Sequence, residues 1–247
     1  MGTQSQFFRM KRTSLAKYIG ICAFVAVEIV LYAMFIAEDF GDAVVGENAY
    51  IKYATVCLAF LFAMIPFIIV AVEDGKGVTD GMLLALGLAL TLVSDLLLLV
   101  KVEFFEVGLV TFIGAQLIYF ARIKRAKLWL IVSIAVRITL SVVGIVVIVA
   151  VGEASAVFVL AEIYFVQLVT NFAENVVSIF TAKGRSEKCR AIVLSIGFLL
   201  FIGCDVCVGL SNLYNGMANE LIWLFYTPSQ VLIALSNRRI YEKGEMD

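Results

Sequence analysis

The chain has 247 residues, of which 62% are hydrophobic and 16% are charged, and its formal net charge is −1. A soluble domain of this length carries far more polar surface, so the composition excludes a water-soluble globular protein. The sequence also contains no basic tract that would bind nucleic acid. We therefore expect lipid to surround most of the exterior, where each spanning segment must satisfy its own backbone hydrogen bonds.

Eight long apolar runs follow one another along the chain. They are continuous and do not alternate with a period of two, which predicts helices and not barrel strands. Short connections join them, so consecutive helices are expected to pack as antiparallel neighbours. The sequence predicts an all-α polytopic bundle of about eight transmembrane helices, forming one integral membrane domain over residues 1–247. The predicted spans are 14–37, 50–72, 78–100, 105–122, 127–151, 155–181, 189–211 and 218–237.

The basic residues alternate between the two ends of these spans. Sixteen of the 19 lysines and arginines precede the first span, follow the last, or lie between spans two and three, four and five, or six and seven. Only Lys52 and Lys101 flank the opposite ends, and Arg137 lies within a span. The positive-inside rule then places both termini in the cytoplasm. We expect an integral protein of a bacterial cytoplasmic membrane.

Two aspartates occupy matching places in the third and seventh spans. Asp95 and Asp205 each follow a glycine, Gly87 or Gly197, by eight residues. At 1.5 Å per residue both lie roughly 25 Å from the cytoplasmic end. A carboxylate in hydrocarbon costs at least a few kcal/mol, so two at one depth indicate a shared polar site in the outer half of the membrane.

Further polar residues lie inside the other spans. Arg137 in span five is at a depth similar to that of Glu174 in span six, which predicts an ion pair between neighbouring helices. Glu28 in the first span has no obvious partner and is expected to line a cavity or to be protonated. In span six, steps of three and four place one polar stripe on a single helical face: Tyr164, Gln167, Asn171, Glu174 and Ser178.

The chain contains no histidine. This excludes a Ser-His-Asp triad, a histidine-based metal site and a histidine proton shuttle. We therefore predict no metal site and no cofactor, and any proton chemistry must fall to the carboxyl groups.

Several short motifs follow one another along the chain in a characteristic order. The first comprises Gly87, Ser94, Asp95, Phe105, Gly108, Phe112, Gln116 and Tyr119. A second acidic helix carries Cys204 and Asp205, and the last helix carries Tyr226 and Gln230. In order, spacing and topology this pattern resembles the YhhN family, the lysoplasmalogenase-like membrane proteins. The histidine of that family corresponds to Gln116 here, which can form hydrogen bonds but cannot shuttle a proton.

The resemblance implies hydrolysis of the vinyl ether bond of a lysoplasmalogen, a membrane lipid, to a fatty aldehyde and a glycerophospho head group. Asp95 and Asp205 would be catalytic, in a division of acid and base roles similar to glycoside hydrolysis. Two carboxyls in a low-dielectric site do not both ionise readily, so one can keep its proton near neutral pH. The candidate substrate-binding residues are Gln116, Tyr119, Tyr164, Tyr226 and Gln230.

Two other functions stay open at this point. A non-enzymatic membrane carrier would use the same carboxyls to bind a lipid or a small cationic molecule. A structural membrane protein would use its polar residues only to hold helices together.

Overall fold

The computed structural model describes residues 2–39, 49–70, 78–123, 126–213 and 219–241. Secondary structure within these ranges is entirely helical, and six of the helices are long and apolar enough to cross a membrane. Two shorter apolar helices, Tyr50–Met64 and Glu220–Leu235, accompany them. The predicted all-α bundle is therefore confirmed. Its elements are α1 (Gly2–Asp39), α2 (Ala49–Val70), α3 (Val78–Asp95), η1 (Leu96–Val100), η2 (Val102–Phe104), α4 (Phe105–Arg122), α5 (Lys127–Val151), α6 (Ala156–Thr181), α7 (Arg185–Leu213), α8 (Asn219–Leu235) and α9 (Arg238–Tyr241).

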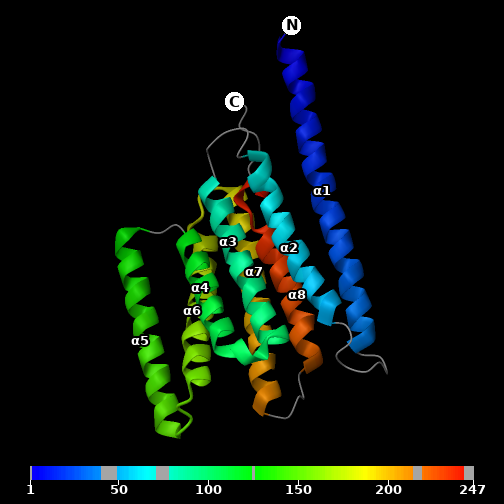
Figure 1. Ribbon diagram of the computed structural model, residues 1–247. Helices are drawn as coiled ribbons and strands as arrows, with labels where there is room; N and C mark the ends of the chain where they lie inside the picture. Colours follow the sequence, from blue (N-terminus) through cyan, green and yellow to red (C-terminus); the bar gives the residue numbers. More distant parts are fainter. Residues whose placement is uncertain (1, 40–48, 71–77, 124–125, 214–218, 242–247) are drawn as a thin grey trace.

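Six helices form a closed ring in the order α2, α3, α4, α6, α7 and α8, each packed against the next, with α8 returning to α2. Helix α1 packs against α2 and α8, whereas α5 packs mainly against α6 (Figure 1). The expectation that consecutive helices pack closely does not hold for α4 and α5, because α4 packs mainly against α3 and α6 and meets α5 through a side-chain contact between Phe120 and Arg137. The interior is shared by the six ring helices, and α1 and α5 stand outside them.

A tight turn determines how α5 meets α6. Gly152 ends α5 with a φ of 90°, a left-handed conformation that glycine adopts without steric cost. Ser155 then begins α6 by accepting a hydrogen bond from the backbone N–H of Phe158. Together these two caps reverse the chain and set α5 antiparallel to α6.

Helix α3 does not run to the predicted end of its span. The α-helix stops at Asp95, and the next five residues form the π-helix η1. The backbone N–H of Lys101 donates to the carbonyl of Leu96 at 3.0 Å, which is the five-residue spacing of a π turn. The hydroxyl of Ser94 donates to the carbonyl of Gly108 at 3.0 Å and fastens α3 to α4 just before this break. Single π turns often occur at functional sites, so the break draws attention to Asp95.

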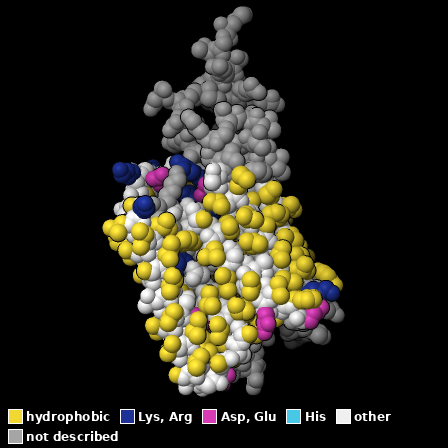
Figure 2. Space-filling model, turned by 60° about the vertical axis from the view of Figure 1, so that its left-hand side comes forward, with side chains coloured by type: hydrophobic (Ala, Val, Ile, Leu, Met, Phe, Trp, Pro, Cys, Tyr) yellow, Lys and Arg dark blue, Asp and Glu magenta, His cyan; other side chains and the backbone are white. Residues whose placement is uncertain are grey.

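The outer surface is apolar over most of its height. Figure 2 shows hydrophobic side chains covering the middle of this face, with most of its basic side chains near the upper edge. Such a surface suits a lipid environment, and the chain is an integral membrane protein. Four of the basic residues used to predict the membrane orientation lie outside the described residues: Lys76, Lys124, Arg125 and Lys243.

Candidate active site

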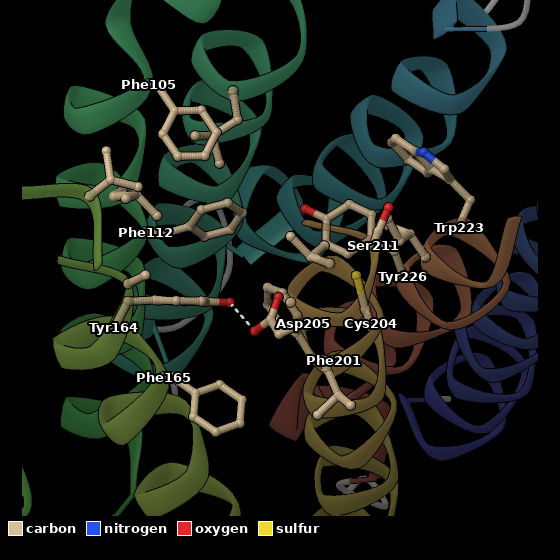
Figure 3. A pocket seen from close by; sticks show the side chains of 18 of the residues that line it. Phe105, Phe112, Tyr164, Phe165, Phe201, Cys204, Asp205, Ser211, Trp223 and Tyr226 are labelled. Carbon is tan, nitrogen blue, oxygen red and sulfur yellow. Dashed lines mark hydrogen bonds between the residues drawn. The ribbon is translucent and has the colours of Figure 1, made fainter. Parts of the chain in front are cut away.

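Asp205 lies on α7, eight residues before that helix ends at Leu213. Its Oδ2 accepts a hydrogen bond from the hydroxyl of Tyr164 on α6, at 2.7 Å (Figure 3). The side chain is half-buried. Tyr164 is the first member of the polar stripe along α6, so the stripe begins beside a carboxyl group.

Asp95 is the last residue of α3 and is only 4% exposed. The hydroxyl of Tyr226, on α8, lies 2.7 Å and 2.6 Å from its two carboxyl oxygens. A hydroxyl that meets both oxygens of one carboxyl holds the group in a fixed orientation. Each aspartate is thus paired with one tyrosine from a different helix.

Phe201 separates the two carboxyl–tyrosine pairs. Its ring centroid lies 6.4 Å from that of Tyr164 and 5.4 Å from that of Tyr226, edge to face in both cases. The ring of Phe112 packs against both Tyr164, at 5.2 Å, and Phe201, at 5.9 Å. These aromatic contacts restrict the rotamers of both tyrosines, which keeps their hydroxyls directed at the aspartates.

A cavity of about 1170 Å³ opens beside these pairs. Asp205, Tyr164 and Tyr226 line it, whereas Asp95 does not. Asp95 contacts the cavity lining through the hydroxyl of Tyr226. Of the two aspartates, Asp205 lines this cavity and Asp95 contacts one of its lining residues, so a site shared by both stays a prediction.

The other three predicted substrate-binding residues do not line this cavity. Gln116 is fully buried and accepts from Asn171 at 3.0 Å through Oε1. Tyr119 packs edge to face on Phe198, and Gln230 donates to the hydroxyl of Ser229 at 3.3 Å. All three occupy the packed interior, and their role in substrate binding stays a prediction.

Comparison with known proteins adds one result to this geometry. Residues 47–237 match the YhhN family, so the matched region contains α2 to α8 and both aspartates. The chain belongs to the YhhN family. A search among curated proteins found no match, and neither did a search among solved structures.

Gly87, eight residues before Asp95 in this YhhN chain, has a packing role. A Cβ at Gly87 would overlap the ring of Tyr119, at 2.8 Å from Cζ, and Tyr119 is only 1% exposed. We predict that Gly87→Ala lowers the free energy of unfolding by about 1–3 kcal/mol, the usual effect of overfilling a packed interior. A thermal unfolding midpoint measured in detergent would show the change.

Gly81 supplies the matched control on the same helix. A Cβ at Gly81 meets no atom closer than 4.0 Å. Gly81→Ala should therefore leave stability unchanged or raise it slightly, since alanine favours a helix by up to about 1 kcal/mol. Equal unfolding midpoints for the two variants would contradict the packing role of Gly87.

The predicted ion pair between Arg137 and Glu174 is confirmed. Nη2 of Arg137 lies 3.0 Å from Oε1 of Glu174. The same guanidinium donates to Gln167 Oε1 at 2.7 Å and to Asn171 Oδ1 at 2.9 Å. It also stacks over the ring of Phe120 on α4, at 4.2 Å from the centroid. The later part of the α6 stripe, from Gln167 to Glu174, is therefore a structural network, distinct from the carboxyl–tyrosine pairs.

One further carboxyl group, that of Glu162, was not among the predicted site residues. Glu162 lies in span six and lines the cavity, with its side chain against Gly144 of α5. It lies two positions before Tyr164, so it projects from a different face of α6 and does not belong to the stripe. An acidic residue within an apolar run was the available signal. Glu28, by contrast, is buried in α1 and does not line the cavity.

Two ion-pair clusters at the ends of the bundle were also missed. At one end Asp80 accepts from Arg122, at 3.3 Å, and from Arg190, at 2.7 Å, which joins α3, α4 and α7. At the other end Lys52 Nζ lies 2.8 Å from Asp39 Oδ1, and both residues line the cavity. The sequence shows these charges near span ends but does not show which of them meet.

Proposed function

We propose that the protein hydrolyses the vinyl ether bond of a lyso-type ether lipid, as the resemblance to lysoplasmalogenase-like proteins implies. One observation carries the proposal: Asp205 and the tyrosine that holds Asp95 line the same cavity. Membership of the YhhN family supports it. The chemistry needs an acid, a base and an apolar space for a hydrocarbon chain. In this proposal Asp205 is the acid, Asp95 acting through Tyr226 is the base, and the apolar lining holds the chain.

In the proposed first step, the carboxyl of Asp205 transfers its proton to the β-carbon of the vinyl ether. The double bond becomes a C–H bond, and an oxocarbenium ion forms that the Asp205 carboxylate stabilises. A water molecule then adds to the cationic carbon. It loses one proton to the oxygen of Tyr226, whose own proton passes to Asp95, and a neutral hemiacetal results.

The second step returns both protons. The hemiacetal hydroxyl gives its proton to Asp205 while its carbon–oxygen bond becomes the aldehyde carbonyl. The departing glycerol oxygen takes a proton from Tyr226, which is replenished by Asp95. One water is consumed, one aldehyde and one alcohol are formed, and both aspartates regain their starting states.

Aldehyde release tests this proposal. Purified protein would be supplied with lysoplasmenylethanolamine, and the fatty aldehyde would be followed over time. The matched control is the saturated alkyl ether of the same lipid, which has no double bond to protonate and should release nothing. Absence of aldehyde from folded wild-type protein would overturn the hydrolase proposal.

One observation favours a carrier as the second candidate. The chain departs from α-helical geometry directly after Asp95, at η1 and η2. Interrupted helices at a polar residue are a recurring feature of membrane transport sites. Saturable binding of the lipid without aldehyde release would support the carrier.

We further propose that both termini face the cytoplasm of a bacterial cell. The charge asymmetry of the connections supports this orientation. Lys183 and Glu153 are exposed at opposite ends of α6. In a background without native cysteines, Glu153→Cys should react with an impermeant maleimide in intact cells, and Lys183→Cys only after permeabilisation. The reverse pattern would overturn the orientation.

A further inference from the structure

The cavity is chemically divided. Its wall along α4 and α6 is mostly hydrocarbon, with Glu162 and Tyr164 as polar members, and the opposite end, formed by α1, α2 and the start of α8, carries charge of both signs. Figure 3 shows Phe105, Phe112 and Phe165 on one side, Trp223 on the other and Asp205 between them. A space with one apolar wall and one charged end fits an amphiphile. The apolar residues include Phe105, Leu109, Phe112, Phe158, Ala161 and Phe165.

Lys52 is the centre of the charged end. Its side chain is only 10% exposed, and its Nζ is 2.8 Å from Asp39 Oδ1. The ammonium also lies 5.5 Å from the ring centroid of Trp223, within cation–π range. Glu220, one turn before Trp223 on α8, lines the same end. The ammonium of a nearly buried lysine at the edge of a lipid-sized cavity can bind an anionic ligand in addition to forming its ion pair within the protein.

The charged residues around the cavity indicate which charges the ligand carries. Among the described residues that line it, Lys52 is the one cation and there are four carboxyl groups: Asp39, Glu162, Asp205 and Glu220. A ligand with negative charge alone would meet net repulsion here. A ligand that carries a phosphate and an ammonium together would satisfy both signs.

We propose that Lys52 and Asp39 form a head-group subsite for a zwitterionic single-chain phospholipid. The Lys52 ammonium binds the phosphate, Asp39 binds the head-group ammonium, and the hydrocarbon chain lies along α4 and α6. The assignment rests on the proposed function only in placing the bond to be cleaved at Asp205. That residue lies eight positions before the end of α7, about 12 Å at 1.5 Å per residue, which leaves room for a glycerophospho group. The volume of about 1170 Å³ slightly exceeds the usual range for small-molecule sites, roughly 300–1000 Å³, as a lipid requires.

Equilibrium binding to the full chain in nanodiscs tests the subsite. The measurements would use an Asp205→Asn background, so that no turnover intervenes. The probes are lysophosphatidylethanolamine and a monoacylglycerol of the same chain length, which lacks the head group. Lys52→Met should weaken binding of the phospholipid at least tenfold and leave binding of the monoacylglycerol unchanged. Lys101→Met is the matched control, since Lys101 is exposed and does not line the cavity.

Two further arms separate charge from folding and head group from free phosphate. Lys52→Arg keeps the positive charge and should keep most of the affinity, whereas Lys52→Met should not. Glycerophosphoethanolamine should compete in the Asp205→Asn background and fail to compete after Lys52→Met, while inorganic phosphate alone should compete in neither. Asp39→Asn should reduce the preference for lysophosphatidylethanolamine over lysophosphatidic acid.

Several outcomes would overturn the subsite. Unchanged phospholipid binding in Lys52→Met would mean that the ion pair only joins α1 to α2. An equal loss for both probes would mean that the lysine supports the fold and not the head group. A different outcome would separate the two proposals. If binding depends on the head group but the wild-type protein releases no aldehyde, the subsite stands and only the hydrolase proposal is overturned.

Discussion

Replacing Asp205 with asparagine is expected to lower the rate of aldehyde release by about 100- to 10,000-fold, the usual contribution of a positioned general acid. Asparagine has nearly the same shape, and its Oδ1 can accept the hydrogen bond that Tyr164 donates at 2.7 Å. It cannot, however, give up a proton to carbon or carry the negative charge that stabilises the cation. The fold should be unaffected, as judged by circular dichroism and the thermal unfolding midpoint.

The second carboxyl should behave similarly but through its tyrosine. Asp95→Asn and Tyr226→Phe are each expected to reduce turnover by a comparable factor, because either change interrupts proton transfer to the cavity. Tyr32→Phe is the matched control, because the hydroxyl of Tyr32 donates to the backbone carbonyl of Leu224 at 3.0 Å. Undiminished aldehyde release in both aspartate variants would remove the aspartates from the mechanism.

Breaking the ion pair between α5 and α6 should produce the largest loss of stability. Arg137→Leu leaves Glu174 without its 3.0 Å partner and is expected to cost about 3–5 kcal/mol, as found for buried pairs broken on one side. Helix α5 packs mainly against α6, so the loss should appear first as separation of α5 from the ring. Protease accessibility of α5 would report this separation before the ring unfolds.

A double-mutant cycle isolates the pair. Arg137→Leu, Glu174→Leu and the double variant would be compared by their free energies of unfolding. If the two charges interact, the double variant loses less than the sum of the single losses. Additive losses would show that the two residues act separately, and Ser133→Ala reports how much the neighbouring hydroxyl contributes to the cluster.

The sequence predicted the helices and one tertiary contact well. Apolar run length placed the helices along the chain, because lipid requires each span to complete its own backbone hydrogen bonds. It did not place every boundary: α1 already begins at Gly2, and the α-helix of α3 ends at Asp95. Depth counted along adjacent spans paired Arg137 with Glu174, since both the rise per residue and the turn between them are fixed.

The partners of the aspartates could not be predicted in the same way. Tyr164 and Tyr226 were candidate binding residues, but the contacts of Asp95 with α8 and of Asp205 with α6 depend on how the ring closes. Ring order depends on side-chain packing between helices distant in sequence, which hydropathy does not encode. The π turn after Asp95 also could not be predicted from the sequence, because Leu96–Val100 is as apolar as an ordinary α-helical segment.

The divided cavity has a consequence for how products would leave. Cleavage at Asp205 would separate an oily fragment from a water-soluble one at the boundary between the hydrocarbon wall and the charged end. The aldehyde could then partition into the bilayer alongside α4 and α6 while the glycerophospho fragment dissolves in water. Each product would move into the phase that it prefers, so neither would need to cross the other's path, and accumulation of one in its phase would not block the exit of the other.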